Sequence, residues 1–587
     1  MKNTRIRKPK ALSSVILCIL LALGAIGLIP NMVFADNDLD SPSDGQAASY
    51  DTHDKAAAHF QFTVRTPANN ATFILPTSSD LNGTYQAKDY NWLIEWGDGE
   101  SEYASGVSLD GDGIGHTYAL AGEYKISILP NGPTDAWLAA FGFNYGYSGT
   151  NTWSNRAMVT EVNSPLRPEM TRTAAQVQGL EAAPDNEWSY VFSSCSNLRV
   201  ISKFAGWDSV TSVGDYFACS MFANCLSLTT LPDGFTLPQS ITTVNGCGFA
   251  MGMFSDCSSL VCLPDGFDFP QNIEVAGDQF ADSMFYNCSE LQTLPDSFNF
   301  PQGILDAGDS FAMNMFAYCQ KLTMLPDAFS LPAGITAAGD NFVYSMFYAC
   351  SDLEALPNGF TFPQGLDSVG DYFAADMFRE CESLATLPAG FNLPQGITQT
   401  GGEFASYMFA YCSSLGPLPA GFNLPQSVSS QSIDFADGMF NQAGGPAFQV
   451  NAEFSLPASI PVEGMRAFHN TFVLARTAPQ QVRSAASIIG SCPTPLTAMN
   501  TFDKHFDDLD YIDVNWGGGG LHPPIVGEAG SGDLNGDGMV TMDEVILTLQ
   551  ATLDASGLSP EQFAAIDMDY DDTITMTDVI LALQKTV

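Results

Sequence analysis

The sequence predicts a multidomain protein: an α/β solenoid of tandem repeats with a parallel sheet, an N-terminal β-sandwich and a small C-terminal α-helical calcium-loop domain. Three observations predict this architecture. A Met-Phe dipeptide recurs about every 31 residues through the middle of the 587-residue chain, a period typical of solenoids. Residues 58–130 alternate apolar and polar side chains, as strands do. An acidic pattern that fits a calcium loop occurs twice near the C-terminus.

The predicted boundaries follow changes in composition or period along the chain. In order, they are a signal peptide at 1–35, a linker at 36–57, the β-sandwich at 58–130, an N-terminal cap region at 131–187, the solenoid at 188–445, a C-terminal cap at 446–520, a linker at 521–531 and the calcium-loop domain at 532–587.

The first 35 residues have the features of an export signal. Lys2 and Arg5 belong to a basic start, and an apolar stretch from Ala11 to Ile29 follows it. Val33-Phe34-Ala35 then offers a small residue at the cleavage point. The apolar stretch is also long enough to span a bilayer, so an uncleaved anchor is the alternative. After cleavage no membrane span is expected, and the protein is predicted to be extracellular, either secreted or associated with the cell surface.

The formal net charge of −44 limits the functions that the chain can have. Such a surface repels nucleic acid and anionic lipid, so no nucleic-acid partner is expected. It suits an extracellular protein in a calcium-containing medium, although solubility alone explains much of it. The sequence shows no nucleophile elbow, zinc motif or phosphate loop, and its non-repeated parts are small. We therefore predict that the protein is not an enzyme.

The N-terminal module combines alternating segments with tight turns. Trp92–Trp96 leads into Gly97-Asp98-Gly99, a turn signal between strands, and His116-Thr117-Tyr118 precedes Gly122–Ile128. These runs resemble the polycystic-kidney-disease (PKD) type of β-sandwich, and the resemblance implies a spacer or presentation module. His116 and Asp98 are interpreted as turn residues rather than as catalytic groups.

The Met-Phe pairs mark eight copies of the repeat, and Val191-Phe192 begins an earlier, degenerate copy. After one step of 32 residues, every step is 31. The pairs begin at Met221, Met253, Met284, Met315, Met346, Met377, Met408 and Met439.

Each copy is predicted to contain a short helix and a strand. Phe311, Met315 and Cys319 recur every four residues, which gives an apolar helical stripe. Asp309 stands where the N-cap of this helix is expected. The run Leu322–Pro326 is short, apolar and ended by proline, so it is predicted to be a strand of a parallel sheet.

The Phe-x-x-Cys-x-x-Leu-x-x-Leu-Pro run and the upstream Gly-Asp-x-Phe-Ala resemble the BspA-like leucine-rich repeats of bacterial surface proteins, over about residues 188–460. A Pro-x-x-Phe segment lengthens each copy. The resemblance implies a secreted or surface-bound recognition protein, often called an adhesin, and we expect the repeat face to bind a host protein or glycan. Side chains between the two leucines vary from copy to copy, which favours binding over an inert spacer.

Three kinds of side chain recur at fixed repeat positions. Eight cysteines are interpreted as small apolar thiols inside the solenoid, with stacked disulfides or a metal relay as alternatives: Cys195, Cys225, Cys257, Cys288, Cys319, Cys350, Cys381 and Cys412. Five aspartates are interpreted as helix caps, or alternatively as a row that collects cations: Asp215, Asp278, Asp309, Asp340 and Asp371. Four tyrosines either pack on the helix or stack on sugars: Tyr286, Tyr318, Tyr348 and Tyr411. Outside the cysteine row, Cys247 and Cys262 are a candidate disulfide pair, and Cys219 and Cys492 have no evident partner.

The two calcium loops are the most specific motif. Oxygen ligands that converge from one tight loop suit a hard cation, so two Ca²⁺ ions are the predicted cofactors. The first set is Asp533, Asn535, Asp537, Met539 through its carbonyl, Thr541 through water, and Glu544. The second set is Asp567, Asp569, Asp571, Thr573 through its carbonyl, Thr575 and Asp578. Gly538 takes the sharp turn in the first loop, whereas Asp572 takes it in the second and predicts a weaker site.

Each loop leads into a helix-forming segment, Glu544–Gln550 and Asp578–Gln584. This duplication, over about residues 530–587, resembles a type I dockerin. The resemblance implies folding on calcium and binding to a cohesin-type protein domain. In that family, two positions of each loop help to select the partner, and here they hold Met542, Asp543, Met576 and Thr577. A polysaccharide-degrading assembly is the alternative setting for such a module.

Overall fold

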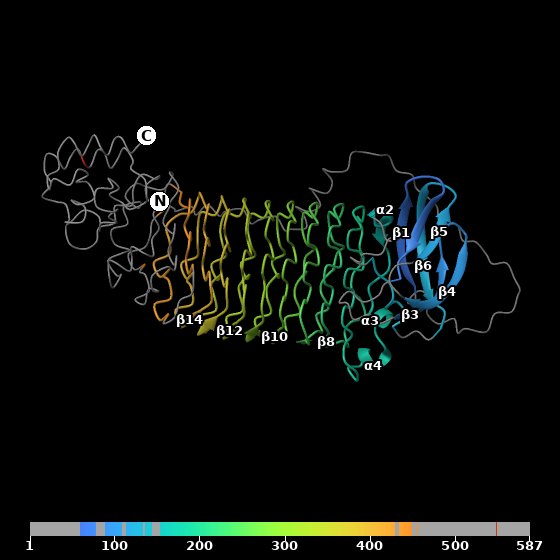
Figure 1. Ribbon diagram of the computed structural model, residues 1–587, viewed down its shortest axis with the longest axis horizontal. Helices are drawn as coiled ribbons and strands as arrows, with labels where there is room; N and C mark the ends of the chain where they lie inside the picture. The colour runs from blue at the N-terminus through green and yellow to red at the C-terminus, as the bar shows by residue number, and fades with distance from the viewer. Residues whose placement is uncertain are drawn as a thin grey trace, which may run out of the picture. The chain divides into compact units, whose positions relative to one another are not determined.

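The structure is a computed structural model (Figure 1), and it describes residues 59–77, 88–108, 113–132, 136–143, 153–428, 434–445 and 447–448, with Phe454 and Thr548. The predicted signal peptide, the linkers, nearly all of the C-terminal cap and the calcium-loop domain except Thr548 lie outside these residues. The described chain divides into two compact units. The first holds the described residues up to Glu274, Ser283–Pro301 and Met324–Phe329; the second holds Val275–Asp282, Gln302–Thr323 and the described residues from Ser330.

The first unit begins with antiparallel β-structure. A five-stranded sheet has the order β4-β3-β6-β1-β7, and β2 pairs with β5 in a two-stranded sheet. The strands are β1 (Phe60–Thr66), β2 (Ala71–Leu75), β3 (Lys88–Glu95), β4 (Ser101–Ser108), β5 (Ile114–Tyr118), β6 (Gly122–Pro130) and β7 (Val159–Val162). The ring of Phe62 on β1 lies 6.0 Å from that of Phe73 on β2, so apolar side chains of both sheets meet. The likeness to PKD-type modules stays a prediction.

Three single-turn helices and a buried ion pair lie in the chain between β6 and the repeats, with α2 before β7 and the other two helices after it. The helices are α2 (Trp153–Arg156), α3 (Pro168–Thr171) and α4 (Ala174–Val177). Arg172, which follows α3, donates to the Glu187 carboxylate at 2.6 Å, and both side chains are only 1% exposed. The Arg172 guanidinium also lies 5.3 Å from the ring centre of Trp207. Because either charge alone would be buried without compensation, the pair fixes this connection firmly.

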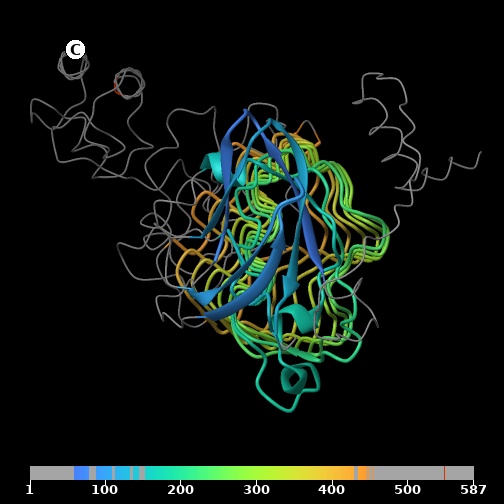
Figure 2. The ribbon, with the colours of Figure 1, turned by 90° about the vertical axis from the view of Figure 1, so that its right-hand side faces the viewer.

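Parallel strands connect successive repeats within each unit. In the first unit, β8 (Ser212–Val213) pairs with β9 (Thr243–Val244). In the second unit, one parallel sheet has the order β10 (Val275–Ala276), β11 (Asp306–Ala307), β12 (Ala337–Ala338), β13 (Ser368–Val369) and β14 (Gln399–Thr400). Figure 2 looks along the stacking direction, in which the turns of chain within each unit overlie one another. The predicted parallel sheet is thus confirmed.

The strands do not come from the segment that was predicted to form them. They precede the Gly-Asp pair of each repeat, whereas the Leu-x-x-Leu segment makes isolated parallel bridges, such as Thr230 with Cys262 and Ala355 with Thr386. The proline that ends this segment lacks an N–H, which limits the bridge to one residue.

The helix predicted in each repeat is wrong for the described repeats. Around Met315 the chain forms a run of turns in which φ is positive at every fourth residue, at Ser310 (57°), Asn314 (53°) and Tyr318 (64°). The N–H groups of Asn314 and Tyr318 donate to carbonyls of the next repeat, Tyr344 and Tyr348, rather than to carbonyls four residues back. An apolar spacing of four fits both backbones, so the pattern alone favoured the more common helix.

The Gly-Asp pair is a clamp between repeats rather than a helix cap. The Asp309 carboxylate accepts a hydrogen bond from the backbone N–H of Asp340 at 2.9 Å, and Asp340 accepts one from Asp371 at 2.8 Å. A Cβ atom on Gly339 would lie 2.8 Å from the backbone nitrogen of Asp309, so glycine is required for this approach. The carboxylates of this row therefore have a structural partner in the neighbouring repeat.

The Met-Phe pairs lie in the core, as predicted. Met346 and Phe347 have no exposed surface, and the Phe347 ring stacks on that of Phe378 at 5.5 Å and 2°. The same stacking continues from Phe378 to Phe409 at 5.5 Å. Each repeat therefore covers the apolar face of the next repeat in its unit.

The eight cysteines of the repeat row are buried and none of them forms a disulfide bond, so the alternative of stacked disulfides is wrong. The Cys350 thiol donates to the carbonyl of Phe316 at 3.1 Å, and the Cys381 thiol donates to that of Phe347 at 3.1 Å. Burial raises the pKa of the Cys257 thiol to about 12, which keeps it protonated. The predicted pairing of Cys247 with Cys262 is also wrong, because Cys247 is free while Cys262 is disulfide-bonded elsewhere.

Candidate functional site

The residues predicted to bind calcium and a cohesin-type partner lie outside the described residues. This applies to every ligand of the loops 533–544 and 567–578, including Met542, Asp543, Met576 and Thr577. Two other clusters of polar and aromatic side chains lie in the described part of the chain, one in each unit.

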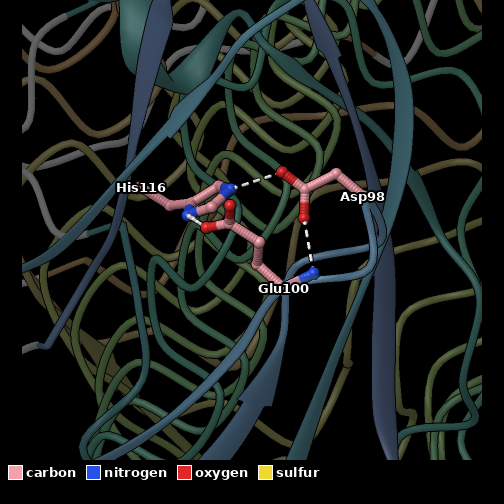
Figure 3. Close-up of side chains that lie close together, drawn as sticks. All are labelled: Asp98, Glu100 and His116. Atoms are coloured by element: carbon pink, nitrogen blue, oxygen red, sulfur yellow. Dashed lines mark hydrogen bonds and ion pairs between the residues drawn. The ribbon is translucent and has the colours of Figure 1, made fainter.

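The first cluster brings together Asp98, Glu100 and His116 at the turn after β3 (Figure 3). The Nε2 atom of His116 lies 2.7 Å from Asp98 Oδ2, and its Nδ1 atom lies 4.0 Å from Glu100 Oε2. Asp98 Oδ1 accepts the backbone N–H of Glu100 at 3.0 Å. The His116 ring is stacked on Trp96, with centres 4.7 Å apart, so the turn is held from two sides.

Electrostatics keep Asp98 in its anionic form. Burial acts to raise the pKa of this carboxyl, but the hydrogen bonds from His116 and from the backbone N–H of Glu100 outweigh it. The pKa of Asp98 is therefore lowered, and the carboxylate is a stable acceptor for the imidazole.

The geometry of this cluster does not fit a three-ligand metal site. The two nitrogens of one imidazole point in different directions, and here Nε2 faces Asp98 while Nδ1 faces Glu100 (Figure 3). One ion cannot be bound by both nitrogens of the same ring. The cluster is a hydrogen-bonded clamp between the turn and β5. Asp98 lies in the turn, as interpreted, whereas the interpretation of His116 as a turn residue is wrong, because His116 lies in the strand β5.

The second cluster lies in the second unit, where tyrosines surround a single arginine. The guanidinium carbon of Arg379 lies 5.4 Å from the ring centre of Tyr407, 5.7 Å from that of Tyr348 and 5.9 Å from that of Tyr411. These distances are within the range of cation–π attraction. We call this cluster the tyrosine–arginine surface and define it as Tyr318, Tyr344, Tyr348, Tyr372, Tyr407, Tyr411 and Arg379.

The tyrosine rings also contact one another. Tyr318 meets Tyr348 edge to face at 5.0 Å and 83°, and Tyr344 meets Tyr372 at 5.6 Å and 72°. Tyr411 and Tyr372 are the most open members, 43% and 36% exposed. In the tyrosine–arginine surface, tyrosine rings therefore pack against one another, and the rings of Tyr411 and Tyr372 are accessible to solvent.

Carboxylates border the tyrosine–arginine surface. Arg379 Nη1 donates to Asp376 at 3.1 Å, and the Tyr348 hydroxyl donates to Glu380 at 3.1 Å. Burial raises the pKa of Asp376 even though Arg379 acts to lower it, and burial likewise raises the pKa of Glu403. These carboxyl groups are thus partly removed from water.

Four of the six tyrosines of the tyrosine–arginine surface lie at positions where the backbone is left-handed. Tyr318, Tyr372, Tyr407 and Tyr411 all have positive φ, between 53° and 64°. A bulky residue is uncommon in that conformation, whereas Asn, Asp and Gly adopt it readily. The interpretation that the repeated tyrosines pack on a helix is wrong, because the helix is not there. Arg379 was missed by sequence reasoning, although its place 31 residues after Tyr348 is a signal that alignment of the copies shows.

Comparison with known proteins identifies the family of the repeats. Residues 188–434 match the BspA type leucine rich repeat region, in six copies. The chain contains BspA-type leucine-rich repeats. Repeats of the BspA type are typical of bacterial surface proteins.

A leucine-rich repeat protein from Bacteroides ovatus is 18% identical, with 55% of this chain and 79% of that chain covered. Its TM-score of 0.20 is too low to support an argument about the fold. No curated protein matches the chain. Within the described residues, no helix is long and apolar enough to cross a membrane.

Proposed function

We propose that this protein is a non-catalytic recognition protein of the bacterial exterior, and that it binds its ligand through the tyrosine–arginine surface. The observation that carries the proposal is the packing of three tyrosine rings against Arg379, at 5.4 to 5.9 Å, in a surface whose members Tyr411 and Tyr372 are open to solvent.

The contrast between core and surface supports this proposal. Core positions hold the same residue in successive copies, as Met346 and Met377 show. At another position, by contrast, successive copies hold Tyr318, Ala349, Glu380 and Tyr411, of which Tyr411 is exposed and Ala349 is buried. Variation is expected where side chains contact a ligand rather than the next repeat. Tyrosine and arginine are also the side chains that most often dominate binding energy at interfaces.

Binding of the full-length chain to an array of glycans and extracellular-matrix proteins tests the proposal. We expect Tyr411→Ala combined with Tyr372→Ala to weaken the strongest interaction by about tenfold or more, which corresponds to about 1.4 kcal/mol. Tyr103→Ala is the matched control, because Tyr103 is 70% exposed and lies in the first unit. Equal binding by both variants, or binding to nothing on the array, would show that this surface is not the ligand site.

We further propose that the C-terminal calcium-loop domain attaches the protein to a cohesin-type partner. The two acidic loops and the duplicated segments that follow them support this attachment. Attachment to a polysaccharide-degrading assembly is the alternative, and it is favoured only if the partner also carries hydrolases. Because export precedes either interaction, we place the protein outside the cell.

A further inference from the structure

The tyrosine–arginine surface offers an aromatic ring face next to hydrogen-bonding groups. Tyr411 is 43% exposed, and Glu380 occupies the same repeat position one copy earlier, with 41% of its side chain exposed. Within the described residues, Glu380 accepts one hydrogen bond, from the Tyr348 hydroxyl, and its Oε1 lies 3.8 Å from Arg379 Nε. A carboxylate can accept several more hydrogen bonds. An apolar platform thus adjoins an acceptor that has spare capacity.

Arg379 adds donors to the same place. Among the described residues its guanidinium makes one hydrogen bond, from Nη1 to Asp376, although it has five N–H groups. About a third of this side chain is exposed. A ligand that presents neighbouring hydroxyl groups can accept from Arg379 and donate to Glu380 at the same time.

The excess of negative charge around the tyrosine–arginine surface disfavours anionic ligands. Asp376, Glu380 and Glu403 outnumber the single cation Arg379, and the whole chain carries −44. Repulsion therefore disfavours sulfated, sialylated or uronic ligands. A lysine-rich peptide would be attracted, but Arg379 already occupies the cation position over three tyrosine rings. A lysine side chain bound there would lie beside the Arg379 guanidinium, and the two positive charges would repel each other.

We infer that the tyrosine–arginine surface binds a neutral saccharide, with a sugar ring stacked on Tyr411 and its hydroxyl groups held by Arg379 and Glu380. A pyranose ring combines an apolar C–H face with hydroxyl groups at its edge, which matches this arrangement of ring, donor and acceptor. The inference rests on the proposed function and specifies its ligand.

Binding of the full-length chain to neutral, sialylated and sulfated glycans, to extracellular-matrix proteins and to a lysine-rich peptide tests this inference. We expect the neutral glycans to bind best, with affinity that changes less than about threefold between about 50 and about 500 mM sodium chloride, because screening acts only on charge pairs. Tyr411→Ala should weaken this binding by about tenfold, and Glu380→Gln by about fivefold. Glu354→Gln is the matched control, since Glu354 is an exposed carboxylate in the neighbouring copy and lies outside the surface.

Three outcomes would overturn the inference. Preference for an anionic glycan or for the peptide, with affinity that falls steeply with salt, would assign the surface to a charged ligand. Binding to matrix proteins alone that is lost in Tyr411→Ala would exclude the saccharide and leave the proposed function intact. Neutral-glycan binding that survives both Tyr411→Ala and Glu380→Gln would place the saccharide site elsewhere.

Discussion

Gly339 shows how one missing side chain sets the distance between two repeats. Its Cα approaches the neighbouring repeat so closely that a Cβ atom would lie 2.8 Å from the Asp309 backbone nitrogen and still closer to the Asp309 carboxylate. The same carboxylate accepts the N–H of Asp340 at 2.9 Å. The small residue and the acidic residue are therefore parts of one contact.

Gly339→Ala should destabilise the repeats by about 1–3 kcal/mol, because the added methyl group forces the two backbones apart. The free energy of unfolding in urea, followed by circular dichroism, measures this loss. Gly390→Ala is the control, since its Cβ would have nothing within 4 Å. Equal stability of the two variants would contradict the clamp.

The lowered pKa of Asp98 predicts a pH-dependent contribution to stability. A carboxyl whose folded pKa lies below its ordinary value of 3.8 contributes stability above that pH. The contribution is lost as the pH falls through the folded value. Asp98→Asn should therefore cost more stability at pH 7 than at pH 3.

Urea unfolding of Asp98→Asn at the two pH values, followed by tryptophan fluorescence, checks this prediction. Glu95→Gln serves as the control, because Glu95 is an exposed carboxylate at the end of the same strand, β3. A loss that is the same at pH 7 and pH 3 would mean that the ionised form of Asp98 is not what stabilises the turn.

At the scale of elements, the repeat is a run of turns whose hydrogen bonds lead to the next copy. The sequence predicted the period and the buried rows, because burial demands the same apolar residue at the same place in every copy. It did not predict the backbone between Ser310 and Tyr318, since intervals of four suit both a helix and turns with a left-handed residue at each fourth position. Hydrogen bonds between copies select the run of turns over the helix, and the sequence of a single copy does not reveal these bonds.

Phe378→Ala should cost about 3–5 kcal/mol, because it removes a fully buried ring from a stack. Its ring contacts those of Phe347 and Phe409, each at 5.5 Å. Thermal unfolding measures the effect. Leu226→Ala, at a position 46% exposed, should change stability by less than about 0.5 kcal/mol. Similar losses for both would mean that the phenylalanine stack is not the core.

At the scale of the whole molecule, each candidate site could be predicted to a different degree. The sequence indicated Tyr318, Tyr348 and Tyr411 but not Arg379, because the stacking of the copies is what brings Arg379 against three rings. Local residue types predict a turn at both Asp98 and His116; Asp98 lies in one, but His116 lies in β5 and reaches the turn through its hydrogen bond to Asp98. The calcium loops are continuous segments, so their ligands are predicted without knowledge of the fold.

Removal of calcium should unfold the C-terminal domain and leave the BspA-type repeats folded. Seven acidic ligands in two loops repel one another until a cation neutralises them. Calorimetric titration of the full-length chain should show two sites, and Asp533→Ala should abolish one of them. Asp233→Ala, an exposed aspartate in the repeats, should leave both sites unchanged.

Circular dichroism and limited proteolysis of the full-length chain, with and without chelator, measure the extent of unfolding. New cleavage sites should lie beyond about residue 530, and the repeat region should stay resistant. No change on chelation would reject the calcium-loop assignment.

The backbone bonding between copies has a consequence for how this protein can change. Where main-chain amides and carbonyls hold the copies together, as from Asn314 to Tyr344, the outward side chain contributes little to the bond. Mutation at those positions can therefore alter what the exterior recognises with little cost to folding. Lengthening by whole copies would add further positions in the same register, so ligand preference can diversify while the interior stays constant.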